Sequence, residues 1–213
     1  GSDFGVVGNE AVTSTSSGRS YGAEFLYQQK LYKGFYAVLA YTWVRSEFLN
    51  KNNVYVPTSW DSRHIVSLTG GKRFKNGWEF GLRWLYSGGA PYTPYNIASS
   101  SLISNWDING VGILDYSQLN TQRESNFHQL NVRVDKKLYL DKFNMNFYFD
   151  VQNAYAFKTK LAPILLVQTN ANNQPIVDPN DPTRYQTTLL ENASGILQPA
   201  LGIIIEFVTK KAK

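Results

Sequence analysis

The chain has two histidines, His64 and His128, and the first of them closely follows Asp61 and Ser62. Serine, histidine and aspartate form the hydrolytic triad, in which the imidazole takes the proton of the attacking hydroxyl. A triad is defined by groups that the fold brings together, and near-consecutive residues at the start of one strand do not position a nucleophile. We therefore interpret both histidines as strand-end residues and keep a hydrolase as the weakest of three functional alternatives.

Aromatic and acidic residues in the long polar segments are better candidates for ligand binding. Aromatic faces beside hydrogen-bonding groups suit a sugar, a siderophore ring or a peptide. The alternative, which the sequence favours, is that these segments only pack over an entrance and shape it. The candidate substrate-binding residues are Tyr92, Tyr95, Trp106, Asp107, Asp115, Tyr116 and Tyr185.

Signatures of other chemistry are missing from the sequence. The chain has no cysteine, which excludes a disulfide framework, a thiolate metal site and a thiol nucleophile. The segment from Asn170 to Asp181 is rich in Asp and Asn but lacks the regular ligand spacing and fixed glycine of a calcium loop. We therefore predict a protein that is not an enzyme and has no catalytic residues, no metal and no cofactor.

The composition narrows the class of protein that must position these residues. The 213 residues are 43% hydrophobic and 15% aromatic but only 17% charged, against roughly 25% charged in an average soluble domain. This apolar and aromatic content excludes a disordered chain. No stretch approaches 18 consecutive apolar residues, so the sequence contains no membrane-spanning helix.

Alternation of apolar and polar residues with period two is the dominant pattern. From Trp78 to Tyr86, every second residue is aromatic or Leu82, whereas Glu79, Gly81 and Arg83 fall on the opposite face. This period is typical of a strand with two different faces. The pattern predicts an all-β, antiparallel fold of seven strands at about 18–31, 35–48, 62–74, 78–88, 127–140, 144–154 and 197–208.

The connections between these strands are unequal in length. The turns at 33–34, 75–77 and 140–142 are tight, whereas 49–60, 89–126 and 155–195 are long and polar. Loops beyond roughly 15 residues are rare in compact soluble domains, and short turns opposite long loops are typical of outer-membrane β-barrels. Strands of roughly 9–11 residues can span a bilayer when their backbones are fully paired. A soluble antiparallel sandwich is the alternative.

Seven segments, in order along nearly the whole chain, resemble the C-terminal part of the barrel of TonB-dependent outer-membrane transporters. The chain departs from that family at Asn131, where an aspartate is usual, and by running six residues past Phe207. The matching segments are Ser20–Glu24 (SYGAE), Ala40–Trp43 (AYTW), Asp61–His64 (DSRH), Tyr86–Pro94 (YSGGAPYTP), Gln129–Lys136 (QLNVRVDK), Asp150–Asn153 (DVQN) and Pro199–Phe207 (PALGIIIEF).

The resemblance implies a fragment of a transmembrane barrel. Barrels of this family have 22 strands and a plug domain in the lumen, so residues 1–213 would be the last seven strands, with the plug and about fifteen strands upstream. The implied function is active import of a scarce nutrient such as a glycan, siderophore or peptide across the bacterial outer membrane. A passive porin or an adhesin-type barrel is the alternative.

The resemblance also implies the partners. These are the protein's own plug and remaining strands, outer-membrane lipid, and the TonB–ExbB–ExbD complex, which would act through the missing N-terminal part. A surface lipoprotein is a further partner that the sequence leaves open. Nucleic acid is not expected, because the aromatic residues alternate onto the lipid side rather than interleaving with a basic patch.

Charged residues on the opposite strand face are expected to form a polar wall around the lumen. In a plugged barrel such residues pair with the plug or with one another across strands, whereas in an open porin they would tune ion selectivity. The predicted lumen- or plug-facing residues are Glu24, Glu79, Arg83, Arg133, Asp135, Asp150 and Glu206.

The net charge of +5 is unevenly distributed over this topology. Eleven of the 21 basic residues lie at the turn end or in the C-terminal tail, and only Asp141 opposes them there. We expect this end to face the anionic headgroups of the periplasmic leaflet. The eleven residues are Lys30, Lys33, Lys72, Arg73, Lys75, Lys136, Lys137, Lys142, Lys210, Lys211 and Lys213.

Overall fold

The computed structural model describes residues 15–207. Val208, the last residue of the final predicted strand, lies outside that range, as do Lys210, Lys211 and Lys213. The structure is 62% strand and 7% helix, which confirms the predicted all-β, antiparallel class. Over residues 15–207, no helix is both long and apolar enough to cross a membrane.

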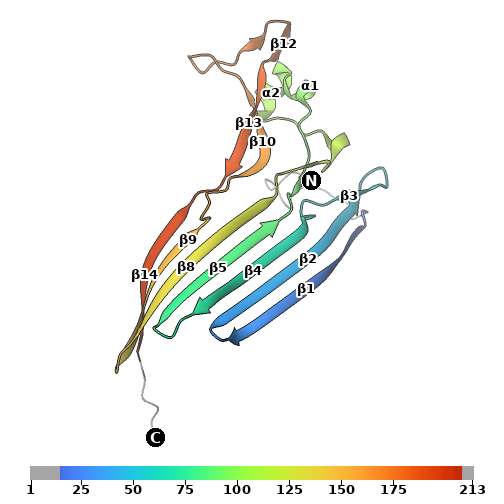
Figure 1. The fold of residues 1–213 in the computed structure, drawn as a ribbon. Helices are drawn as coiled ribbons and strands as arrows, with labels where there is room; N and C mark the ends of the chain where they lie inside the picture. Colours follow the sequence, from blue (N-terminus) through green and yellow to red (C-terminus); the bar gives the residue numbers. More distant parts are fainter. Residues whose placement is uncertain (1–14, 208–213) are drawn as a thin grey trace.

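Seven long strands form one twisted sheet in which each strand is antiparallel to the next (Figure 1). The sheet is open over residues 15–207, because the edge strands at its two ends each pair on one side only. A short strand, β3 (Tyr55–Pro57), adds to β2. In spatial order the long strands are β1 (Gly18–Tyr32), β2 (Phe35–Leu49), β4 (Arg63–Arg73), β5 (Trp78–Ser87), β8 (Phe127–Tyr139), β9 (Phe143–Gln152) and β14 (Gln198–Phe207).

The register places apolar and polar residues on opposite sides of this sheet. Trp84 of β5 lies opposite Leu130 of β8, on what we call the apolar face. Five positions along the same register, Glu79 lies opposite Asp135, on what we call the polar face. Successive side chains of a strand point to opposite faces, so the alternation in the sequence becomes a separation of chemistry across the sheet.

The tight turns lie together at one end of the sheet (Figure 1). Two of them contain a glycine with positive φ, Gly34 at 85° and Gly77 at 80°. A Cβ atom at Gly34 would lie 2.4 Å from the carbonyl oxygen of Arg73 on the neighbouring strand. Glycine adopts this conformation without steric cost, which lets the chain reverse with so few residues.

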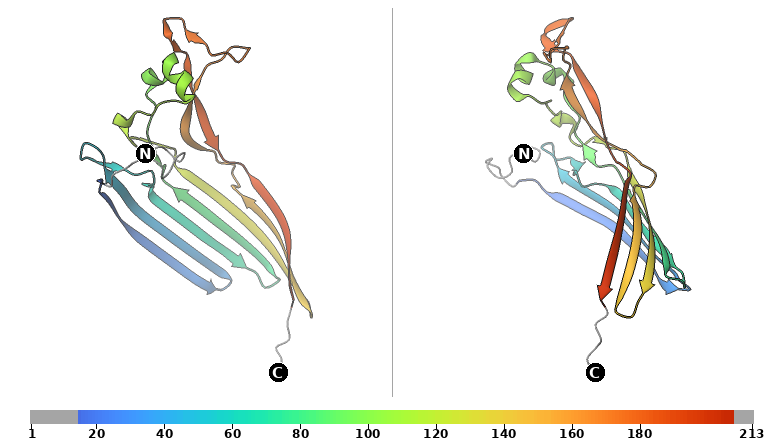
Figure 2. Two further views of the ribbon diagram at one scale, coloured as in Figure 1. Left: turned by 180° about the vertical axis from the view of Figure 1, so that it is seen from behind. Right: turned by 90° about the vertical axis from the view of Figure 1, so that its left-hand side faces the viewer.

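The long connections contain more regular structure than the sequence predicts. Residues 155–195, expected to be a loop, include a ribbon of two antiparallel strands, β10 (Thr159–Val167) and β13 (Thr187–Ser194). The run Leu161–Val167 does not alternate, so the period-two pattern does not identify it as a strand. The ribbon continues the β9–β14 pair beyond the sheet (Figures 1 and 2).

The ribbon and the β5–β8 connection together form what we call the loop lobe, residues 91–123 and 159–194. Figure 2 shows it projecting beyond the loop end of the sheet. Tyr95 and Leu165 pack against Gly112 within it. Its other elements are β6 (Pro91–Tyr92), α1 (Ile97–Ser100), α2 (Ile103–Asn109), the 3-10 helix Tyr116–Gln118, β7 (Gln122–Arg123), β11 (Val177–Asp178) and β12 (Asp181–Tyr185).

Asn153 fixes the bend between the sheet and the ribbon. It is 6% exposed and has a positive φ of 51°, a conformation that asparagine tolerates better than most residues. Its side chain accepts a hydrogen bond from the Phe157 amide at 2.9 Å and donates to the carbonyls of Phe157 at 2.9 Å and Ile196 at 3.2 Å. One amide side chain therefore joins the β9–β10 bend to the β13–β14 bend.

We expect Asn153→Ala to loosen this bend. The substitution removes three side-chain hydrogen bonds, each of which contributes about 0.5–1.5 kcal/mol, and puts a less suitable residue at positive φ. Amide hydrogen exchange should accelerate across residues 155–196. Asn52→Ala, at an exposed position whose side chain makes no hydrogen bond within residues 15–207, is the control. Unchanged exchange in Asn153→Ala would refute the role of Asn153.

Candidate functional site

The polar face carries a cluster of charged side chains near the turn end. Glu79 accepts a hydrogen bond from the Tyr36 hydroxyl at 3.0 Å and forms ion pairs with Arg73 at 3.1 Å and Lys137 at 3.4 Å. These partners come from β2, β4 and β8, which the sheet places on either side of β5. A carboxylate predicted to face the lumen is thus held by three neighbouring strands.

Arg133 and Asp135 continue the cluster on β8. The Arg133 guanidinium donates two hydrogen bonds to the Asp135 carboxylate, both at 2.9 Å, and stacks over the Tyr148 ring at 4.1 Å. Asn146 donates to the same carboxylate at 2.6 Å. Asp135 is 8% exposed, and the Arg133 guanidinium balances the charge of this nearly buried carboxylate. We call Tyr36, Arg73, Glu79, Arg133, Asp135, Lys137, Asn146 and Tyr148 the wall cluster.

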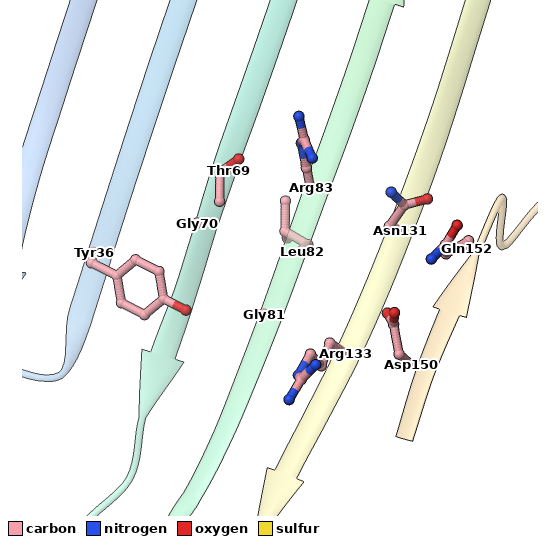
Figure 3. A pocket seen from close by; sticks show the side chains of 10 residues that line it. All are labelled: Tyr36, Thr69, Gly70, Gly81, Leu82, Arg83, Asn131, Arg133, Asp150 and Gln152. Atoms are coloured by element: carbon pink, nitrogen blue, oxygen red, sulfur yellow. The ribbon is translucent and has the colours of Figure 1, made fainter. Parts of the chain in front are cut away.

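A cavity of about 320 Å³ adjoins the wall cluster on the same face (Figure 3). Gly81 leaves the backbone bare at its centre, and the Tyr36 ring reaches over β4 toward it (Figure 3). Arg83 and Asp150 line the cavity, and neither forms an ion pair with any residue between 15 and 207. These two predicted lumen residues are therefore available to a molecule on the polar face.

The structure does not bring all seven predicted lumen residues together. Glu79, Arg133 and Asp135 belong to the wall cluster, and Arg83 and Asp150 to the adjoining cavity. Glu206 lines a separate cavity of about 180 Å³ with Lys137. Glu24 lies opposite Thr42 in the first strand pair, away from both.

The predicted substrate-binding residues are spread over three places. Tyr185 donates a hydrogen bond to Asp107 at 3.0 Å, which puts Trp106 beside them in the upper part of the loop lobe. Tyr95 packs inside the lobe against Gly112 and Leu165, and Tyr92 is in β6, paired with Gln122.

Asp115 and Tyr116 lie lower, at the rim of the sheet. Tyr116 lines a cavity of about 580 Å³ with Phe48 and Leu49 of β2. Asp115 accepts hydrogen bonds from the Ser117 amide and hydroxyl and from Gln118, which lower the pKa of its carboxyl. The loop aromatics thus shape a lobe and a rim rather than one binding site.

A buried carboxylate at the loop end was not among the predicted site residues. Asp61 is fully buried. It accepts a hydrogen bond from the Ser46 amide at 2.9 Å and forms ion pairs with Arg45 at 3.4 Å and with Arg123. Arg123 also donates to the carbonyl of Gly89 at 2.9 Å. Asp61 therefore ties the β2–β4 connection to both ends of the β5–β8 connection.

These contacts are inconsistent with the triad considered from the sequence. The Asp61 carboxylate is bound by arginines, and His64 Nδ1 makes a 3.0 Å hydrogen bond with the Tyr41 hydroxyl. His128 Nδ1 is likewise bonded to the Tyr155 hydroxyl at 2.7 Å. Both imidazoles are thus strand-end groups on the apolar face, where they join the aromatic residues.

Comparison with known proteins gives no match for this chain. No protein-family model matches the chain, and no curated protein sequence matches it. Between residues 15 and 207, no group of three or more His, Asp or Glu side chains could hold a metal ion.

One ion pair secures the upper part of the loop lobe. Arg184 of β12 donates to Ser101, the C-cap of α1, at 2.8 Å and to the carbonyl of Ala98 within α1. Asp181 holds the same guanidinium at 2.9 Å. Hydrogen bonds from Thr183 and the charge of Arg184 lower the pKa of the Asp181 carboxyl below its ordinary value of 3.8. The carboxylate is therefore the form that orders this region.

We expect Asp61→Asn to destabilise the loop end of the molecule. An amide would leave the Arg123 guanidinium without its counter-charge and would leave Arg45 paired with Glu47 alone. Breaking a buried ion pair in this way costs about 3–5 kcal/mol. Equilibrium denaturation should show this loss of stability. Asp141→Asn, at an exposed turn, is the matched control and should change stability by less than about 0.5 kcal/mol. Equal effects of the two variants would contradict the role of Asp61.

Acid should loosen the contact between β12 and the helices. Because the pKa of Asp181 is lowered in the folded state, its contribution is present above the unfolded-state pKa and is lost as pH falls through the folded-state value. The Tyr185 amide, which donates to the Ser101 carbonyl at 2.8 Å, should lose protection from hydrogen exchange in that acid range. Asp181→Asn should show reduced protection at neutral pH and little further dependence on acid. An unchanged profile in this variant would refute the mechanism.

Proposed function

We propose that this chain forms the wall and extracellular loops of a TonB-dependent active transporter in the bacterial outer membrane. In this proposal, residues 18–207 are the last seven strands of a 22-stranded barrel whose plug and other strands lie upstream. The transporter imports a scarce nutrient such as a glycan, siderophore or peptide. Its partners are the plug, the remaining strands, outer-membrane lipid and the TonB–ExbB–ExbD complex, with a surface lipoprotein as a further candidate.

The exposure of the apolar face is the observation that carries the proposal. Phe25 is 56% exposed, Phe149 45% and Ile203 58%, although each belongs to a regular strand of the main sheet. Leu165 and Pro91, both in the loop lobe, are the only apolar side chains between residues 15 and 207 that are buried. Soluble sheets bury their apolar face against a second layer, whereas the strands of a membrane barrel direct it toward lipid.

The total surface supports the same conclusion. The accessible area of the chain is 15145 Å² for 24.1 kDa, about half as much again as the roughly 10,000 Å² of a compact monomer of this mass. Both edge strands also have unpaired backbone groups, which are costly in lipid. Further strands would pair these edges and an apolar environment would cover the exposed face, and a barrel wall provides both.

The polar face suits the inside of a plugged barrel. The wall cluster neutralises most of its own charges, but Arg83 and Asp150 still face a cavity. In an open pore these two residues would meet water and ions, and in a plugged barrel they would meet the plug. In this proposal, transport depends on movement of the plug, which is the step that TonB would drive.

The orientation of the chain can be tested by labelling. The chain has no cysteine, so a single cysteine can be placed in the full-length protein at Asn76, in a turn, or at Asn109, in the loop lobe. A membrane-impermeant maleimide should label Asn109→Cys on intact cells, and Asn76→Cys only after the outer membrane is permeabilised. Labelling of Asn76→Cys on intact cells would contradict the orientation.

Energy coupling is tested by uptake. Cells that depend on the full-length protein for growth on one of a panel of glycans, siderophores or peptides should stop taking up that nutrient when TonB is deleted. Uptake that continues without TonB would overturn active transport and favour a passive porin. Uptake by cells with TonB but without the protein provides the baseline.

A further inference from the structure

A shallow groove lies on the apolar face at the turn end of the sheet. It has a volume of about 280 Å³. Its apolar walls are Phe74, Trp78, Phe80 and Val134, and Asn76 and Glu79 complete its lining. Phe74 is 47% exposed, Trp78 43% and Phe80 41%. The backbone closes its end through the Asn76 turn. We call this feature the turn-end groove. Its apolar walls are suited to contact with a hydrocarbon chain.

Two lysines flank the turn-end groove on the same face. Lys136 lies opposite Trp78 in the register, and its Nζ atom donates to the Asn76 carbonyl at 2.6 Å, 5.2 Å from the Trp78 ring centre. Lys72 lies opposite Phe80, with its Nζ atom 4.3 Å from the Phe35 ring centre and 5.2 Å from that of Phe74. An ammonium group therefore stands on each side of the aromatic walls.

These two positive charges have no carboxylate partner between residues 15 and 207. The nearest acidic residues in the register, Glu79 and Asp135, point to the polar face and are held there by the wall cluster. Lysine side chains at a membrane interface lay their methylene stems along apolar surface and keep the ammonium among the headgroups. A counter-charge for Lys72 and Lys136 must then come from outside the chain.

We propose that the turn-end groove binds a phospholipid with a net anionic headgroup. The phosphate lies between Lys72 and Lys136, and the first part of an acyl chain lies against Phe74, Trp78 and Phe80. A zwitterionic headgroup would bring its own cation toward the two ammonium groups and bind less well. This inference rests on the proposed membrane location, and it adds a specific lipid site to it.

The test uses the full-length protein in lipid nanodiscs, with a single cysteine at Asn76 carrying a bimane fluorophore in a background without other cysteines. Host phosphatidylcholine contains a small, equal mole fraction of either phosphatidylglycerol or phosphatidylcholine labelled with a nitroxide near the headgroup. The phosphatidylglycerol quencher should be enriched at the groove, since each interfacial lysine changes anionic-lipid binding by roughly fivefold. The double variant K72Q/K136Q should bring the two quenchers to equal effect.

Lys33→Gln with Lys142→Gln is the matched control, because these lysines lie in turns at the same end but outside the groove. This control should keep the preference for phosphatidylglycerol. Equal quenching by both lipids in the unmodified lysine background, or loss of the preference in the control, would overturn the specific site while leaving the membrane location intact. Absence of quenching by either lipid would contradict the proposed membrane location itself.

Discussion

Backbone pairing between neighbouring strands is the constraint on which the rest of the molecule depends. Ten consecutive residue pairs join β5 to β8, and ten join β9 to β14, so the period-two alternation is transmitted across these pairs without a slip. The β1–β2 pair shifts its register once, between Gln29 and Tyr32, close to the turn. A shift of one residue would move every side chain of a strand to the other face. The exposed aromatics, the wall cluster and the lysines of the turn-end groove all follow from this register.

Carboxylates in this framework are held by cations from different strands. Glu79 is bound from β4 and β8, and Asp61 is paired with arginines of β2, β4 and β7. Buried charges are costly unless they are paired and hydrogen-bonded, so each carboxylate specifies which strands and loops must lie together. On the polar face this leaves a wall with little free charge, and at the loop end it holds two connections in one arrangement.

The strands could be predicted from the sequence much better than the sites. Alternation such as that of Trp78–Tyr86 is local, and the seven ranges expected from it correspond to the seven long strands of the sheet. The β10–β13 ribbon was missed because Leu161–Val167 is continuously apolar and its partner lies some thirty residues away. The pairing of Asp61 with Arg123 spans 62 residues, and no local pattern signals it. Tyr36 and Asn146 lie on the polar face with Glu79 and Asp135. Only the register of the strands shows that Tyr36 contacts Glu79 and that Asn146 contacts Asp135.

The small core of the loop lobe has a consequence for the order of assembly. Among residues 91–123 and 159–194, Leu165 and Pro91 are the buried apolar residues, so we expect neither connection to fold by itself. In the proposed orientation both segments must cross the outer membrane before Arg184 can reach Ala98 and Tyr185 can reach Asp107. In that orientation they would cross as extended chain and take their shape only on the far side. A loop lobe with so small an apolar core would therefore stay unfolded until it had crossed the membrane.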